Sequence, residues 1–468
     1  MMLTRRQALA TLAASLPSTA APAQPNFIVI TIDDLGYADV QPFGDVPYTP
    51  HLKRMAEEGL TFTSWYAAPV CSPSRSALLT GCYPRRVGLS FGSWHPVLMP
   101  GDWHGLNPSE MTVAEVLKAR GYRTGCIGKW HLGDQPEFLP TRQGFDSYFG
   151  IPYSNDMRPT PKPLGIAQRP HPPLPMVRNE TLVHEIKDQD FLTAAYTAEA
   201  VSFLKENRRR PFFLYLPHSM VHAPLAAGQT WRGKTGKELY HDSVAEIDWS
   251  VGTILQTLRD LNLDKNTLVF FMSDNGGTPR ADNKPLRGNK ASTWEGGIRV
   301  PALAWWPGTV PAGKRSQAIT SNMDILPTLA ALAGAPLPKV RIDGHNLSGM
   351  LRRPTDRHPY DAFFYWSANK LEAVREGDWK LRQGELYNLA DDIGETRNVA
   401  AQHPDIVKRL TARLEAHRAD LGDGDQPGPG VRACGKAKGP LRFWIGRHPE
   451  SGFPPQAPVK DVPGAPVD

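Results

Sequence analysis

The chain has 468 residues, 40% of them hydrophobic and 21% charged, which is the composition of a globular protein rather than a disordered or fibrous one. Its formal net charge of +6 is too small to predict nucleic-acid binding, although it suits an anionic substrate. No apolar run is long enough to span a bilayer, so we expect no membrane span, and the length favours a large domain with a smaller companion.

Residues 1–23 have the pattern of an export signal. Arg5 and Arg6 precede a short apolar stretch over residues 8–14, and residues 21–23 form a small-residue cleavage site. Paired arginines ahead of a weakly hydrophobic run indicate the twin-arginine route of bacteria. We therefore expect a periplasmic or secreted protein.

Three short apolar runs predict buried parallel strands, over residues 26–32, 211–216 and 267–272. Polar side chains follow each run: Asp33 and Asp34, then His218 and His222, then Asp274 and Asn275. Because open α/β sheets place their sites at the carboxyl ends of the strands, we expect these side chains to meet.

Helical patterns lie between the runs and begin at Thr112, near Asp190 and at Asp242; Gly121 ends the first of them. Strands alternating with helices of this length predict an α/β fold with a large, mostly parallel sheet covered by helices on both faces. The proline-rich stretch over residues 157–179 is typical of a surface excursion, which either shapes the substrate mouth or is a mere loop.

After residue 350 the pattern changes to short alternating runs separated by turn residues, which predict an antiparallel sheet. A helix over residues 404–421 would pack on this sheet, and the glycine- and proline-rich remainder would wrap around the protein or stay loose. The predicted organisation is an export signal over 1–23, a large domain over 24–350, and a small C-terminal antiparallel-sheet-plus-helix domain over 351–468.

The stretch from residue 70 to residue 81 places a cysteine just before a predicted helix. Pro73 suits the first helical position, and Gly81 suits the helix end. A helix N-terminus favours negative charge on or beside Cys71, and Arg75 adds a cation with donors suited to a tetrahedral anion. Taken alone, however, Cys71 is better interpreted as a buried structural cysteine.

Asp33, Asp34, Asp274 and Asn275 offer only oxygen ligands, which favour Ca²⁺ or Mg²⁺ over Zn²⁺. An isolated aspartate is more often a turn former or a helix cap. Two acidic clusters that follow two predicted core strands favour a metal site instead.

Lys129 and His131 stand two apart after a predicted strand over residues 122–128, so in extended backbone they would point the same way. Such a pair supplies an anion site with a fixed charge and a titratable proton carrier. Lys290 would add a second cation, although alone it is typical of a solvated surface.

Two motifs point to other functions. His218 and His222 have the i, i+4 spacing of a metal pair, but the glutamate of a zinc-protease motif is missing and Pro224 argues against a sustained helix. Residues 228–235 match the phosphate-loop pattern, yet residues 222–224 intervene between the strand and this loop. Nucleotide hydrolysis is therefore disfavoured.

Cys71-x-Pro-x-Arg75 followed by Leu-Leu-Thr-Gly resembles the signature of the type I sulfatases, in the alkaline phosphatase superfamily. Further resemblance covers nearly the whole chain: Asp33-Asp34, Gly128 to His131, Gly150 to Ser154, His222-Ala223-Pro224, Asp274-Asn275-Gly276, the stretch around Lys290, and Leu386 to Asn398. The resemblance implies hydrolysis of sulfate monoesters of aryl alcohols or carbohydrates. It also implies Ca²⁺, with Mg²⁺ as an option, held by Asp33, Asp34, Cys71, Asp274 and Asn275.

In the mechanism that the resemblance implies, a formylglycine-generating enzyme oxidises Cys71, and the hydrated aldehyde attacks sulfur through one hydroxyl. His222 and Lys290 would assist the departing oxygen. His131 would take the proton of the second hydroxyl, which expels sulfate. Arg75 and Lys129 would hold residue 71, and Ser154 would assist through a hydrogen bond.

Several alternatives stay open. Phosphate or phosphonate monoester hydrolases share the expected fold and metal, and an anion-binding protein with unmodified Cys71 would need no catalysis. The esterified alcohol, exo or endo action, the oligomeric state and the role of His218 are not predicted. Cys82, Cys126 and Cys434 allow at most one internal disulfide, whose pairing is also open.

Overall fold

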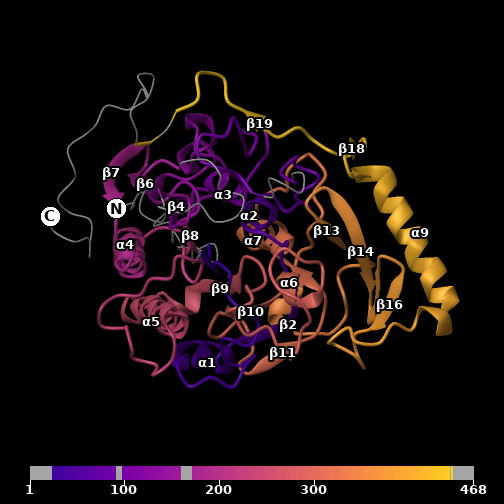
Figure 1. Ribbon diagram of the computed structural model, residues 1–468. Coiled ribbons are helices and arrows are strands. Elements are labelled where there is room, and N and C mark those ends of the chain that lie inside the picture. The colour runs from indigo at the N-terminus through magenta and orange to yellow at the C-terminus, as the bar shows by residue number, and fades with distance from the viewer. Residues whose placement is uncertain (1–23, 91–96, 160–170, 443, 446–468) are drawn as a thin grey trace, which may run out of the picture.

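The computed structural model describes residues 24–90, 97–159, 171–442 and 444–445, so the expected export signal lies outside the described residues. The main sheet has the strand order β11-β2-β10-β9-β1-β8-β4-β5-β6-β7, with β12 beside β2 (Figure 1). These strands are β1 (Asn26–Ile32), β2 (Leu60–Tyr66), β4 (Arg123–Ile127), β5 (Ser147–Gly150), β6 (Leu174–Arg178), β7 (Thr181–Ile186), β8 (Phe212–Pro217), β9 (Thr267–Ser273), β10 (Arg299–Trp305), β11 (Lys314–Ser316) and β12 (Thr320–Ser321).

The three predicted core strands form the centre of this sheet. Strand β1 lies between β8 and β9 and is parallel to both, with Ile30 opposite Leu216 on one side and Phe271 on the other. All three strands are buried over their whole length. Their carboxyl ends therefore meet at one edge, as predicted, while antiparallel strands β10, β6 and β7 extend the sheet on either side.

Helices cover both faces of the main sheet (Figure 1). On one face α1 (Pro50–Glu57) and α4 (Leu192–Asn207) pack against α5 (Leu239–Asp260). On the other, α7 (Ile325–Ala333) packs against α2 (Cys71–Thr80), α3 (Val113–Lys118) and α8 (Ser348–Arg352). None of the described helices combines the length and apolar character that crossing a membrane requires.

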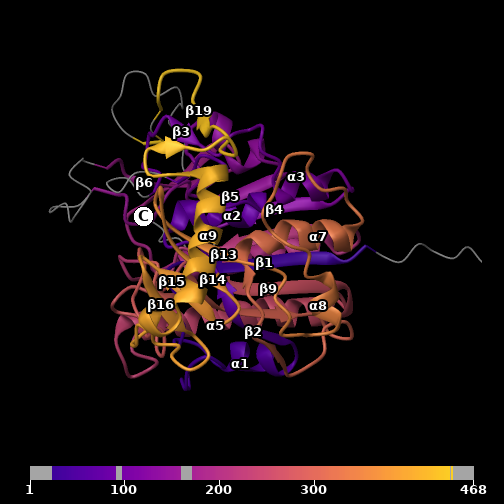
Figure 2. The same ribbon diagram turned by 90° about the vertical axis from the view of Figure 1, so that its right-hand side faces the viewer.

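A second, antiparallel sheet follows, made of β13 (Phe363–Ser367), β14 (Lys370–Glu376), β15 (Trp379–Arg382) and β16 (Glu385–Asn388). Helix α9 (Pro404–Leu421) lies across it, as Figure 2 shows, and buries Ile406, Leu410 and Leu414. The predicted fold class is therefore confirmed: a large, mostly parallel sheet with helices on both faces and a small antiparallel sheet with a helix after it.

The chain beyond α9 wraps back over the large sheet's side of the protein. It first forms the short pair β17 (Gly422–Asp423) and β18 (Gln426–Pro427). Farther on, β19 (Gly435–Lys436) pairs with β3 (His104–Gly105), so of the two predicted alternatives the described tail wraps.

Three element predictions need correction. The proline-rich excursion does not extend to residue 179, because residues 174–178 form β6; Pro175 is tolerated there since only β7 pairs with that part of the strand. Helix α5 begins three residues before Asp242. Helix α2 begins at Cys71 itself: the amide of Ser74 bonds the carbonyl of Val70, which makes Val70 the N-cap.

Candidate active site

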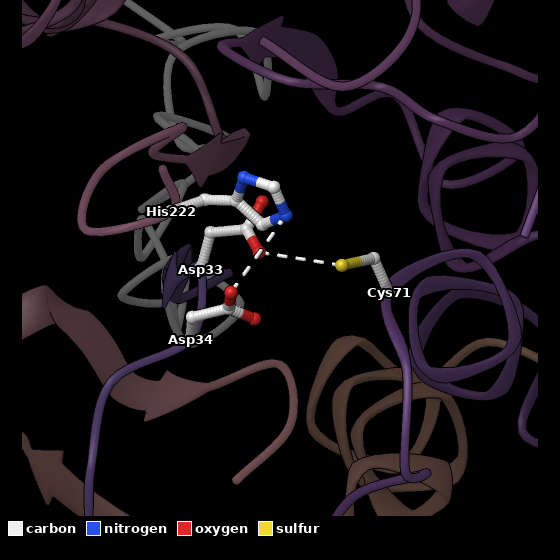
Figure 3. Close-up of side chains that lie close together, drawn as sticks. All are labelled: Asp33, Asp34, Cys71 and His222. Carbon is white, nitrogen blue, oxygen red and sulfur yellow. Dashed lines mark hydrogen bonds and ion pairs between the residues drawn. The ribbon is translucent and has the colours of Figure 1, made fainter. Parts of the chain in front are cut away.

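Asp33 and Asp34 leave the end of β1 and face helix α2 (Figure 3). Consecutive residues of an extended strand point to opposite faces, so a straight continuation would separate the two carboxylates. Asp34 instead has a left-handed backbone, with a φ of 63°. This turn, sparsely populated outside glycine and asparagine, brings both carboxylates to one site.

Cys71 is buried at the head of α2, with its Sγ 3.3 Å from Asp33 Oδ1 and 3.4 Å from Lys290 Nζ. Burial, and then the charge of Asp33, raise the pKa of its thiol well above the usual value despite the helix N-terminus and the cations nearby. The negative charge expected at this helix N-terminus is therefore carried by Asp33, beside residue 71, and the sulfur is uncharged. Cys82, Cys126 and Cys434 are likewise free thiols, so no disulfide joins the four cysteines.

Arg75 joins the two acidic clusters. Its Nη2 lies 2.7 Å from Asp274 Oδ2 and 3.2 Å from Asp33 Oδ2, and its Nη1 donates to the Lys129 carbonyl at 2.6 Å. Burial raises the pKa of Asp33, but Lys129, His222 and Arg75 together hold it well below its usual value. Burial and the neighbouring charge of Asp33 raise the pKa of Asp274 to about 6.

Lys129 is fully buried, forms an ion pair with Asp33 and donates to Ser154 Oγ at 2.9 Å. It follows Gly128, whose φ of 129° and close approach to strand β8 exclude a side chain: a Cβ there would lie 1.9 Å from the Pro217 carbonyl oxygen. The backbone amide of Lys129 bonds the same carbonyl at 2.8 Å. The end of β4 is thus pressed against β8, which aims the lysine at Asp33.

His131 does not continue an extended strand as expected, because its φ is 59°. Its Nε2 lies 2.9 Å from the Leu98 carbonyl; a carbonyl only accepts, so Nε2 carries the proton. Nδ1 is then a buried lone pair without a partner. Burial, followed by Lys129 and Arg75, lowers the pKa of His131 well below its usual value, which keeps the ring neutral.

Lys290, His222 and Asn275 surround Asp34. The Nζ of Lys290 lies 2.6 Å from Asp34 Oδ1, and the Nε2 of His222 lies 3.7 Å from Asp34 Oδ2. The amide nitrogen of Asn275 donates to Asp34 Oδ1 at 2.8 Å, while its Oδ1 is buried without a partner. The predicted residues from seven separate segments are therefore brought together in space.

These residues fit a hard divalent cation. Within the described part of the chain, Asp33, Asp34, Cys71 and His222 each offer a ligand atom, all within 4.8 Å of one another (Figure 3). The orphaned Oδ1 of Asn275 is a further oxygen of the right kind. The grouping differs from the predicted ligand set, since it includes His222, whereas the Oδ2 of Asp274 is engaged by Arg75.

Asp156 is a neighbour that the sequence reasoning missed. Its carboxylate accepts a hydrogen bond from Ser154 and lies in the field of His222. These effects lower the pKa of this exposed side chain. The Ser154-x-Asp spacing was its only signal, and it is common in loops without any function.

His218 and the phosphate-loop motif lie apart from this group. His218 is buried, its Nε2 is 3.3 Å from Ser250 Oγ on α5, and burial lowers its pKa to about 3. In the phosphate-loop motif Thr235 donates to Asp242 of α5 at 2.7 Å, and turns rather than a strand precede it. A phosphate loop joins a strand directly to a helix, so this geometry does not favour the nucleotide-hydrolysis alternative.

The fold and the site together fit one class, a hydrolase for anionic esters, because three cationic side chains and a cluster that could hold a divalent cation surround residue 71. A sulfatase family model matches residues 25–335, and a model of the C-terminal part of N-sulphoglucosamine sulphohydrolase matches residues 289–420. The chain therefore belongs to the sulfatase family and is a sulfuric ester hydrolase.

Its relatives agree with this assignment. Human arylsulfatase A is 38% identical over 488 aligned residues, which cover 92% of this chain and 94% of that protein. Human N-acetylgalactosamine-6-sulfatase is 38% identical over 476 residues, covering 93% and 82%. The crystal structure of Ps i-CgsB in complex with k-i-k-neocarrahexaose superposes with a TM-score of 0.73 at 33% identity, covering 84% of this chain and 92% of that one.

Proposed function

We propose that the protein hydrolyses sulfate monoesters of aryl alcohols or carbohydrates through a formylglycine made from Cys71, with bound Ca²⁺ or Mg²⁺. The observation that carries this proposal is the setting of Cys71. The side chain heads a helix, touches both Asp33 and Lys290, and has a pKa raised well above its usual value. A protonated thiol is a poor nucleophile, so this position needs chemical conversion before it can attack an ester.

Asp33, Asp34, Asp274 and Asn275, with residue 71, would hold the cation. When bound, a divalent cation supplies positive charge that polarises the sulfate oxygens and the attacking oxygen. Arg75 and Lys129 then have a clear task. By neutralising Asp33 and Asp274, they allow three carboxylates to stand close together in a buried site.

An aldehyde at residue 71, once hydrated, supplies one hydroxyl for attack on sulfur and a second that loses its proton, so that the carbonyl re-forms while the bond from carbon to the sulfated oxygen breaks and sulfate leaves. His131 suits the role of proton acceptor, because its ring is neutral and its buried Nδ1 has a free lone pair. Lys290 and His222 face the same space from the Asp34 side, where they would assist the departing alcohol oxygen. Ser154 accepts a hydrogen bond from Lys129 and so helps to position its ammonium group.

The class of alcohol that carries the sulfate is suggested by the names of the relatives and not by the geometry of the site. Arylsulfatase A and N-acetylgalactosamine-6-sulfatase act, by name, on an aryl and a hexosamine sulfate, and both have similar identity to this chain. A panel of sulfated monosaccharides and a chromogenic aryl sulfate, assayed for sulfate release, would separate the two classes.

We further propose twin-arginine export, maturation by a formylglycine-generating enzyme, and domains over 24–350 and 351–468.

We expect kcat/KM to be higher for an aryl sulfate than for the matched aryl phosphate. Three carboxylates balance the cations Arg75, Lys129 and Lys290, so only the two charges of the metal remain to meet the substrate. A sulfate monoester carries one negative charge, whereas a phosphate monoester carries nearly two at neutral pH. One unit of charge in a polar site is worth a few kcal/mol, which permits weak phosphatase side activity.

Fully matured enzyme and two esters of the same phenol are needed for this comparison. A higher kcat/KM for the phosphate ester would replace the sulfatase proposal with the phosphatase alternative.

A further inference from the structure

Lys290 stands on a long loop that follows β9, also carries Asp274 and Asn275, and leads into the short helix α6 (Glu295–Ile298) before β10. The amide of Gly276 donates to the Gly297 carbonyl at 3.0 Å and closes the base of this loop. The amide of Ala291 donates to the Pro69 carbonyl at 2.9 Å, two residues before Cys71. The distance between Lys290 and residue 71 therefore depends on how this loop is held.

The small C-terminal sheet holds the loop on the far side of Lys290 through one buried lysine. Lys380 of β15 is fully buried, and its Nζ donates to the Thr293 carbonyl at 2.8 Å and lies 3.0 Å from Glu295 Oε1. The same Nζ is 2.7 Å from Oε1 of Glu395, whose Oε2 accepts the backbone amide of Glu295 at 2.8 Å. Lys380 is thus shared by two buried carboxylates and fastens three segments together, while Arg299 and Arg375 approach the other oxygen of Glu295 at 3.3 Å and 3.9 Å.

The loop is also anchored before Lys290. Arg287 donates to the Glu395 carbonyl at 2.7 Å, and its guanidinium lies 3.7 Å from the ring centroid of Trp294. Arg382 of β15 lies 4.0 Å from the same centroid and donates to Thr293 Oγ1 at 3.0 Å. Anchors three residues before and three residues after Lys290 therefore both end on residues 380–395.

We propose that Lys380 is a positioning residue for Lys290: it fixes the loop so that the Lys290 ammonium faces Asp34 and residue 71. This inference rests on the proposed role of Lys290 in the reaction. Without Lys380, Glu295 would keep Arg299 and Arg375 beside it, but Glu395 would lose the cation it shares with Glu295, and repulsion between the two buried carboxylates would loosen the loop. A catalytic group displaced by about 1 Å can cost up to about a hundredfold in rate.

The test is a double-mutant cycle between Lys380→Met and Lys290→Met, with Lys370→Met as matched control. Lys370 is an exposed lysine of the same sheet, and its variant should retain full activity. We expect Lys380→Met to lower kcat by about tenfold or more through misplacement of Lys290. In the Lys290→Met background, the same substitution should change kcat by less than about twofold, because it acts through a side chain already removed.

Equal losses from Lys380→Met in both backgrounds would show that it does not act through Lys290 and would overturn the proposal, as would an unchanged kcat. Full activity of Lys290→Met would instead overturn the role that we propose for Lys290. That result can be told apart from the two above, and it would overturn this inference as well. If Lys380→Met does not fold, Arg382→Met replaces it: its side chain is only partly buried and anchors the same Thr293, so the same non-additivity is expected.

Discussion

The Cys71→Ser variant is expected to fold, to keep its metal site and to stop after a single turnover. Serine supplies one hydroxyl, which can attack sulfur and release the alcohol. The resulting sulfate ester has no second hydroxyl on the same carbon whose deprotonation could re-form a carbonyl and expel sulfate, so the enzyme would remain sulfated. Loss of a nucleophile's full function costs about 10⁴-fold or more in kcat.

The measurement is the amount of chromogenic alcohol released per enzyme molecule, followed by the mass of the peptide that contains residue 71. We expect at most one equivalent of alcohol, and sulfate on that peptide. Cys434→Ser, at a half-buried cysteine outside the site, is the control and should turn over normally. Continued turnover by Cys71→Ser would exclude an essential second hydroxyl at this position.

Removal of the metal is the second change with a large expected effect. A strong chelator should abolish activity, because Arg75, Lys129 and Lys290 only balance the three carboxylates and no net positive charge is then left to meet the substrate anion. Ca²⁺ or Mg²⁺ should restore activity better than Zn²⁺, since Asp33, Asp34, Asp274 and Asn275 offer oxygen ligands. Conversion of Cys71 to an aldehyde would remove the sulfur atom from this cluster of described residues and strengthen this preference.

Two variants distinguish the predicted ligand set from the grouping that includes His222. Asn275→Leu removes the orphaned Oδ1 and should weaken Ca²⁺ binding, seen as a smaller rise in unfolding temperature when Ca²⁺ is added. His222→Gln should lower kcat and leave that rise nearly unchanged. Zn²⁺ as the best activator, or a larger loss of Ca²⁺ binding in His222→Gln than in Asn275→Leu, would contradict the oxygen-ligand assignment.

Much of the fold was predictable because the strands and helices at its centre have clear local signals in the sequence. Strands β1, β8 and β9 are continuous apolar runs, and the capping box at Thr112 and the apolar stripe of α5 mark helices without any tertiary information. Strand β6 was missed because Pro175 within it and the prolines before it are typical of a loop. It pairs with β5 and β7, and neither of these two strands was predicted from the sequence.

The site residues were found from motifs, but their geometry was not. Asp34 and His131 have left-handed backbone, and although aspartate and histidine adopt it more often than most residues, they do so too rarely for the sequence to predict it. The raised pKa of the Cys71 thiol reflects burial, which outweighs the helix N-terminus. The contact between Lys380 and Glu295 joins residues 85 apart in the chain, so only the folded structure reveals it.

The central claim is that residue 71 acts as an aldehyde, and the mass of the peptide containing this residue tests it most directly. Active enzyme should be digested and the masses of the residue-71 peptide compared between preparations of different specific activity. We predict that the fraction carrying formylglycine rises in proportion to specific activity towards an aryl sulfate. Full activity in a preparation whose peptide carries only unmodified cysteine would contradict the account.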